Sequence, residues 1–167
     1  GSLTTARAGH TATLFGTDEI LFAGGYTTLL FTSTATAEVW DGGTITATTG
    51  PMAFERLAPS AALLDDGRVV VAGGAAFLAS PYSLVVHDTV EVYDPALGTF
   101  SAGPSPLPEA KYGAAAVAIP GRLLLLGGQT SETQMTAGCS WVDLATLATA
   151  EMGSLAAPRG FGEAILT

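Results

Sequence analysis

The chain has 167 residues, 48% of them hydrophobic and 13% charged, so most of it is expected to be buried in one folded domain. Fifteen acidic residues against six basic ones give a formal net charge of −9, and no basic run occurs, which argues against nucleic acid and anionic membrane surfaces as partners. No apolar run approaches the ~18 residues of a membrane-spanning helix, so no membrane insertion is predicted.

The first predicted element is a β-hairpin near the amino terminus. Residues 11–15 form a strand in which threonine alternates, and residues 16–18 form a turn. An apolar strand follows at 20–23 and ends in Gly24-Gly25. Two short β-prone runs separated by a glycine-containing turn are typical of a hairpin.

The second copy is the clearest. Residues 61–64 are apolar, residues 65–67 form an Asp-Asp-Gly turn, and the strand at 69–72 ends in Gly73-Gly74. That strand is apolar at every position, so both faces of its sheet must be covered. With no room for crossover helices, this pattern predicts sheets packed on sheets.

A third copy follows, and the three are in register. Residues 114–119 and 123–126 flank a Pro-Gly turn and lead into Gly127-Gly128. A basic residue precedes the first glycine of each pair by 17, 17 and 16 positions, and these residues are Arg7, Arg56 and Lys111. After each pair come a loop and a strand ending in aspartate, at 38–41, 91–94 and 140–143. A period of roughly 50 residues with four strand-like segments is typical of a propeller blade.

These features together resemble the kelch repeats of the galactose-oxidase-like central domain superfamily. The second copy matches best, with Glu91-Val92-Tyr93-Asp94 and with Phe100 on its fourth strand, where the other copies have Ala47 and Thr149. The resemblance implies an all-β fold, a kelch-type β-propeller segment of about three four-stranded antiparallel blades plus the first strand of a fourth.

The expected organisation is a single kelch-repeat domain over residues 3–167. Its units cover about 7–55, 56–110 and 111–158, and a fourth begins at 159. Gly1-Ser2 resembles a cloning scar.

The loops after the glycine pairs vary in length while the strands do not, which favours them as binding elements. In kelch propellers these loops share a face with the segments that enter each blade, and the resemblance implies a ligand-binding face there. Its candidate residues are Tyr82, His87, Asp88, Gln129, Glu132, Gln134, Arg56, Lys111 and Arg159.

The repeated basic residues have two interpretations. They could bind acidic groups of a ligand, or each could anchor its unit by pairing with a carboxylate such as Glu38, Glu91 or Asp94. Because a basic residue recurs in every copy while ligands are seldom symmetric, the structural interpretation is favoured.

No catalytic group and no metal or other cofactor is predicted. His10 is isolated, and the matching positions in other copies are Pro59 and Gly162, so it is expected to hydrogen-bond to the backbone. His87 and Asp88 are adjacent on an extended segment and point to opposite faces, which disfavours a catalytic pair. Cys139 is the only cysteine and cannot form an internal disulfide.

The leading hypothesis is a non-catalytic module that binds a protein or carbohydrate ligand, from a secreted or surface protein of a bacterium. A rival is the propeller portion of a secreted copper oxidase resembling galactose oxidase, with active-site residues partly outside this chain. The residues here that could take part, which match no motif of that family's copper ligands or of its thioether-linked cysteine and tyrosine, are Tyr26, Tyr82, Tyr93, Tyr112, His10, His87 and Cys139. A purely structural surface repeat is the third alternative.

The chain is also expected to be an excerpt of a longer, six- or seven-bladed protein. Residues 159–166 repeat the opening of each copy, so both ends of the chain supply the same strand of a blade. Apolar blade faces left open at both ends predict self-association.

Overall fold

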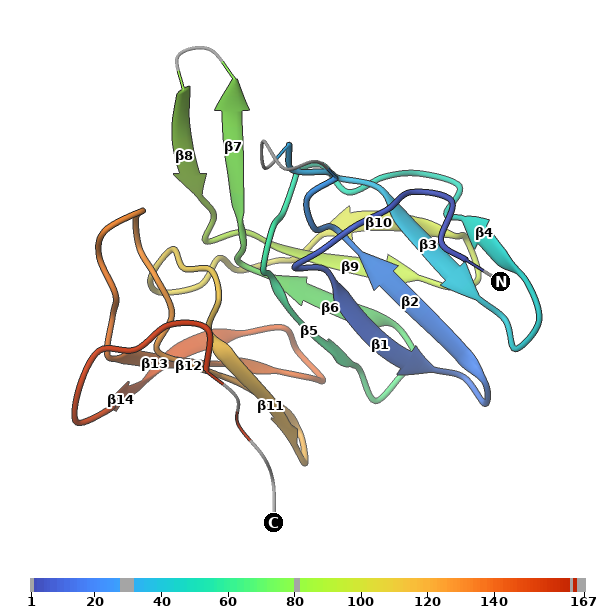
Figure 1. Cartoon of the computed structure of the whole chain (residues 1–167). Coiled ribbons are helices and arrows are strands. Elements are labelled where there is room, and N and C mark those ends of the chain that lie inside the picture. Colours follow the sequence, from blue (N-terminus) through green and yellow to red (C-terminus); the bar gives the residue numbers. More distant parts are fainter. Residues whose placement is uncertain (1, 28–31, 80–81, 163, 165–167) are drawn as a thin grey trace.

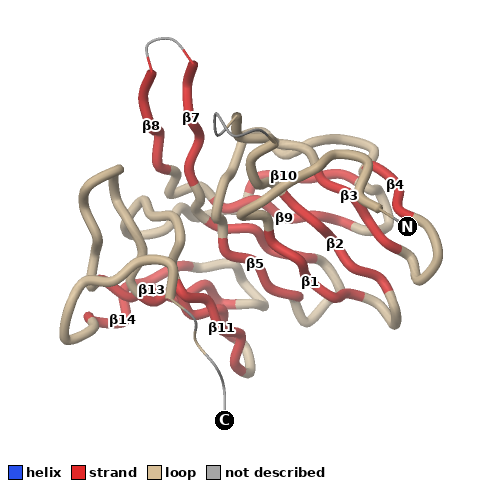
Figure 2. The backbone as a smooth tube through the Cα atoms, viewed as in Figure 1, coloured by secondary structure: helices blue, strands red, loops and turns tan. Residues whose placement is uncertain are grey.

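The computed structural model describes residues 2–27, 32–79, 82–162 and 164 (Figure 1). Within these residues every regular element is a β-strand, as Figure 2 shows. None of them forms a helix long and apolar enough to cross a membrane. The strands make three four-stranded sheets and one two-stranded sheet, all with antiparallel pairing between neighbours. The prediction of an all-β chain is confirmed.

The first and third sheets are meanders, because each strand pairs with the next one along the chain. The first sheet contains β1 (Thr11–Phe15), β2 (Glu19–Ala23), β3 (Ala37–Trp40) and β4 (Ile45–Ala47). The third contains β11 (Ala115–Ile119), β12 (Arg122–Leu126), β13 (Gly138–Asp143) and β14 (Thr149–Ser154).

The second sheet has the same plan with an insertion. It contains β5 (Ser60–Leu63), β6 (Val69–Ala72), β9 (Val90–Asp94) and β10 (Thr99–Ala102), in the order β10-β9-β6-β5. Between β6 and β9 the chain forms a separate hairpin from β7 (Ala75–Ala79) and β8 (Tyr82–Val86). In space β5 lies between β1 and β11, so the three sheets follow one another side by side (Figure 1).

Strand β6 is buried on both faces, as its unbroken apolar sequence predicts. Val69, Val70 and Val71 have no exposed surface. Val69 and Val71 pack with the hydrophobic cluster shared with the first sheet, whereas Val70 packs with the cluster shared with the third. Successive side chains of a strand point to opposite faces, so β6 supplies both cores.

The long segment after the second glycine pair is a hairpin, whereas the sequence analysis treats it as a loop. One face of the hairpin, with Phe77 and Leu84, packs against Tyr112 and Leu57. Residues 75–79 are apolar at every position and residues 82–86 are β-prone, but these runs lie outside the four-strand repeat.

The glycine pairs connect neighbouring sheets. Gly24 and Gly25 have φ of +71° and +94°, and the Gly25 N–H donates to the Arg56 carbonyl over 2.7 Å. A Cβ on Gly24 would clash with the same carbonyl oxygen, so glycine is required for both its φ and its close approach. The equivalent bonds run from Gly74 to Lys111 (2.9 Å) and from Gly128 to Arg159 (2.8 Å).

A second connection uses the residue two positions after each basic residue. Gly9, Ala58, Gly113 and Phe161 all have positive φ, at +61°, +45°, +59° and +53°. Each N–H donates to the carbonyl of the previous member, over 2.7, 2.9 and 2.7 Å. A backbone hydrogen-bond ladder therefore passes from sheet to sheet, although two of its four members are not glycine.

Candidate binding face

The end of the sheets that carries the glycine pairs, the connections after them and the repeated basic residues is called the loop end below. Its most regular feature is a buried cluster of one basic residue, one carboxylate and backbone carbonyls in each sheet, which we call the polar joint. Burial and hydrogen bonding within the three polar joints determine which predicted site residues are accessible to a ligand.

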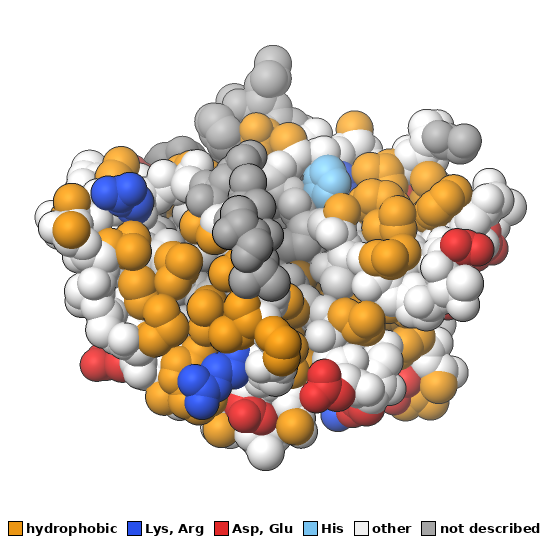
Figure 3. All heavy atoms as spheres, turned by 90° about the horizontal axis from the view of Figure 1, so that it is seen from below, with side chains coloured by type: hydrophobic (Ala, Val, Ile, Leu, Met, Phe, Trp, Pro, Cys, Tyr) orange, Lys and Arg blue, Asp and Glu red, His pale blue; other side chains and the backbone are white. Residues whose placement is uncertain are grey.

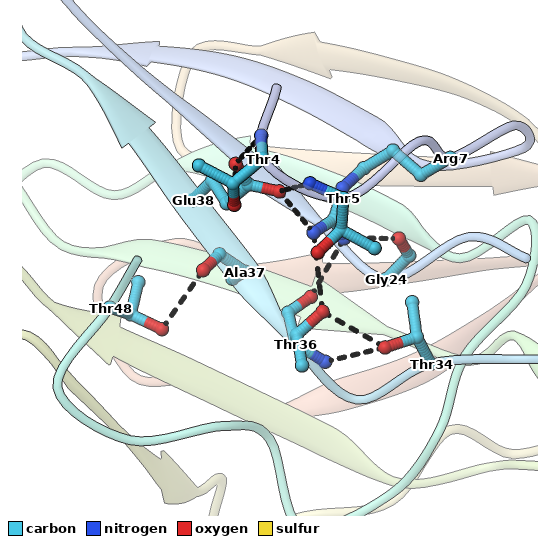
Figure 4. A network of polar contacts seen from close by, with 9 residues as sticks. All are labelled: Thr4, Thr5, Arg7, Gly24, Thr34, Thr36, Ala37, Glu38 and Thr48. Carbon is cyan, nitrogen blue, oxygen red and sulfur yellow. Dashed lines mark hydrogen bonds and ion pairs between the residues drawn. The ribbon is translucent and has the colours of Figure 1, made fainter. Parts of the chain in front are cut away.

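In the first polar joint, Arg7 bonds to Glu38 (Figure 4). Arg7 Nη2 lies 2.7 Å from Glu38 Oε1, and the two side chains are 0% and 2% exposed. Arg7 Nη1 donates to the carbonyls of Gly24 and Thr36 over 2.7 and 2.9 Å. The N–H and hydroxyl of Thr4 donate to Glu38 Oε2. Burial alone would raise the pKa of Glu38, but the hydrogen bonds from Arg7 and Thr4 outweigh it and lower that pKa.

The second polar joint repeats this arrangement. Arg56 donates to Glu91 Oε1 from Nη2 over 2.8 Å and from Nε over 3.1 Å. It also donates to the hydroxyl and the carbonyl of Thr89 and to the carbonyl of Gly73. The Ala53 N–H donates to Glu91 Oε2 over 2.7 Å. Arg56 is completely buried and pairs with Glu91, the contact that the structural interpretation of this residue predicts.

The third polar joint departs from the first two. Lys111 replaces arginine, Ser140 stands where Glu38 and Glu91 stand, and Gly138 replaces the threonine. Lys111 Nζ donates to the Gly138 carbonyl over 2.9 Å and lies 3.3 Å from Glu109 Oε2. The carboxylate therefore comes from the entering segment and not from the third strand of the sheet.

His87 lies close to the second polar joint. Its ring centroid is 5.1 Å from that of Phe54, and the Arg56 guanidinium lies 5.8 Å from the centroid of the same Phe54 ring. Burial and then the charge of Arg56 lower the pKa of His87, while Asp88 opposes the shift. Of the predicted site residues, the structure thus brings Arg56, His87 and Asp88 together.

The predicted residues of the third loop form a separate group. Gln129 pairs its backbone with Tyr112, the N–H of Gln134 donates to Ser131 Oγ over 3.1 Å, and the charge of Glu132 adds to burial in raising the pKa of Tyr112. This group is built on the connection after β12.

Arg159 and Tyr82 complete the predicted set. The side chain of Arg159 is exposed, unlike those of Arg7 and Arg56, while its carbonyl accepts the bond from Gly128. Tyr82 begins β8, where its backbone pairs with Ala79; its side chain lies outside the described residues.

The residues considered for copper are spread over the three sheets. His10 packs against Phe22 of the first sheet, Tyr93 lies buried in the second, and Cys139 is buried on β13 of the third. In the described part of the chain no three histidine, cysteine or acidic residues gather in a way that could hold a metal ion.

Sequence reasoning missed three features of the loop end: the exposed residues Leu78 and Val85 of the hairpin, Phe54 beneath His87, and the space beside Ser140. Alignment of the copies shows that Ser140 replaces the glutamate of the first two. The space beside Ser140 could not be predicted in this way, because it depends on where Lys111 lies.

Comparison with known proteins extends the description of the fold. No protein-family model and no curated protein matches the chain. Among solved structures, the chain is similar to the structure of YjhT, with a TM-score of 0.75 and 12% sequence identity, covering 92% of this chain and 54% of that one. The chain thus spans about half the length of YjhT, and a likeness at this identity shows the fold alone.

Proposed function

We propose that the chain is a kelch-type propeller segment that serves as a non-catalytic binding module for a protein or carbohydrate ligand. Three sheets of one plan, joined by the same glycine and polar contacts, support the propeller assignment, as does the likeness in fold to YjhT. The repeated plan of the first two polar joints supports a scaffold, because Arg56 and the two terminal nitrogens of Arg7 donate to groups of the protein.

The observation that carries the binding role is the β7–β8 hairpin, which stands out from the body of the molecule (Figure 1). Phe77 and Leu84 anchor one face of it. The opposite face carries Leu78 and Val85, which are 44% and 39% exposed. Exposed apolar side chains on a projecting hairpin are suited to a partner that covers those side chains.

A protein and glycan array tests this role with the double variant Leu78→Ser, Val85→Ser. We expect the variant to keep the melting temperature of the wild type and to lose its partners, because the substitutions leave the anchored face intact. Leu97→Ser is the matched control, since Leu97 is 67% exposed in the turn between β9 and β10. Equal binding by the double variant and the wild type would refute the role of the hairpin.

We further propose that the chain associates with itself. Hydrophobic side chains gather over much of the face seen from below in Figure 3. The first strands of the sheets expose apolar side chains: Leu14 of β1 is 57% exposed, and Leu63 of β5 is 39% exposed. Apolar surface of this kind is typical of an interface. Light scattering on the purified chain tests the proposal, and a compact monomer at micromolar concentration would contradict it.

A further inference from the structure

A pocket of about 300 Å³ lies beside the third polar joint. Its wall includes Lys111, Gly138 and Ser140, and it also includes Glu109 and Glu151. In the first two sheets the places of the first three residues are held by arginine, threonine and glutamate. The equivalent pocket of the second sheet, lined by Thr89 and Glu91, has a volume of about 180 Å³. The smaller residues of the third sheet therefore go with a larger pocket in the same place.

The inner end of this pocket contains two side chains, Lys111 and Ser140, that can donate further hydrogen bonds. The side chain of Lys111 is 1% exposed, and its ammonium group has three N–H bonds. One is donated to the Gly138 carbonyl, and Nζ lies 3.3 Å from Glu109 Oε2 as an ion pair. Ser140 is also 1% exposed, and among the described residues its Oγ has no hydrogen-bond partner. Buried polar groups of this kind are normally satisfied, so an oxygen acceptor is expected between them.

The outer end of the pocket is acidic. Glu151 is exposed on β14 directly opposite Ser140, and the Glu109 side chain is 41% exposed. In the first two sheets the residue opposite the glutamate is Ala47 or Ala102. In the third sheet the small residue therefore lies on the third strand and the carboxylate on the fourth, the reverse of the first two sheets. Two carboxylates against one ammonium disfavour a simple anion and favour a ligand with a positive group next to its acceptor.

We propose that this pocket binds a small zwitterion, a free α-amino acid with a short side chain. Its carboxylate accepts from Lys111 and Ser140, in the place that Glu38 and Glu91 carboxylates fill in the other sheets. Its ammonium group lies between Glu151 and Glu109. A pocket of this volume stands at the lower end of the range for ligand sites, which suits a molecule of this size.

Titration of the whole chain with glycine, acetate and methylammonium, followed by amide chemical shifts in NMR, tests the proposal. Glycine should shift residues around Ser140, and acetate and methylammonium should each bind at least about tenfold more weakly, because each lacks one of the two charged contacts. Acetate binding as tightly as glycine, or no shift with glycine, would overturn the proposal.

Three variants locate the ligand. Ser140→Ala should weaken glycine binding about tenfold, and Ser140→Glu should abolish it by returning a carboxylate to the pocket. Glu151→Gln should weaken glycine but strengthen acetate; if it strengthened glycine instead, Glu151 itself would be the natural occupant and the proposal would fail. Arg68→Ala, at the opposite end of the second sheet, is the control and should bind glycine as the wild type does. The hairpin variants do not touch this pocket, so a failure here leaves the proposed hairpin role standing.

Discussion

The second and third polar joints occupy the same place in neighbouring sheets, but only the second is complete. Arg56 is surrounded by Glu91, Thr89 and the Gly73 carbonyl, and Glu91 is buried with it. Lys111 is equally buried, yet its carboxylate partner Glu109 is 41% exposed and comes from the entering segment. Both joints keep the basic charge compensated, and they differ in where the compensating carboxylate is held.

This difference shows how a repeated structural element can become available for binding. A buried charge must keep a partner, so no member of the second joint can be lost alone. In the third joint the arginine, threonine and glutamate have all been replaced, and Glu109 supplies the carboxylate. The backbone contacts of the glycine pair are unchanged, so the sheets stay connected although the pocket beside the joint grows from about 180 to about 300 Å³.

The largest expected effect comes from breaking the complete joint. Arg56→Ala leaves Glu91 buried without its partner, and we expect a loss of about 3–5 kcal/mol of unfolding free energy. Lys111→Ala should cost less, because Glu109 can turn into solvent. Urea unfolding measures both, with Arg68→Ala of the exposed Arg68–Asp66 pair as a control that changes stability by less than about 1 kcal/mol. Equal losses for Arg56→Ala and Lys111→Ala would remove the distinction between the joints.

The next largest loss of stability is expected from alanine substitution of the first glycine of each pair, and it should be equal in the second and third sheets. A Cβ on Gly73 would lie 2.5 Å from the Lys111 carbonyl oxygen, and a Cβ on Gly127 would clash in the same way with that of Arg159. Both residues have positive φ, so substitution by alanine adds strain to the clash. We expect each alanine variant to lose about 2–3 kcal/mol.

Gly67→Ala provides the matched control for this prediction. Gly67 also has positive φ, but nothing lies within 4 Å of its added Cβ, so the cost should be strain alone, about 1 kcal/mol. Thermal unfolding of the three variants separates strain from clash. A Gly127→Ala variant as stable as Gly67→Ala would show that the third sheet tolerates a looser connection.

The parts of the molecule that repeat could be predicted from the sequence. The three hairpins, the burial of Val69–Ala72 on both faces and the pairing of Arg7 and Arg56 with carboxylates follow from register and residue type. The β7–β8 hairpin was missed because it occurs in one unit only. The pocket was missed because cavity volume depends on where Lys111 and Glu109 lie in space, which a substitution at position 140 alone does not reveal.

A smaller change, this time a gain in stability, is expected from a substitution in the backbone hydrogen-bond ladder. Ala58 leads into the second sheet with a φ of +45°, whereas the equivalent residues of the first and third sheets are Gly9 and Gly113. An alanine in this conformation is strained, so Ala58→Gly should raise stability by about 0.5–1 kcal/mol despite the added freedom of the unfolded chain. Ala61→Gly, within strand β5, is the control and should lower stability. A destabilised Ala58→Gly variant would mean that its methyl group contributes more to packing than its φ costs.

The smallest effect expected is a pH dependence of stability that comes from His87, beside the second joint. His87 stands two residues before Thr89, where the first and third sheets have Thr34 and Thr136. Burial and Arg56 lower the pKa of His87 in the folded protein, so the unfolded chain takes up its proton first as the pH falls. Stability from this residue is therefore complete above the unfolded pKa of about 6.5 and declines as the pH falls from there toward the lower folded pKa. His87→Thr should remove this part of the decline. His10, whose pKa is lowered by burial and then by Arg7, should retain its own share of the decline in that variant. Urea midpoints between pH 5 and pH 8 measure the difference, and parallel curves for the variant and the wild type would show that His87 titrates alike in the folded and unfolded protein.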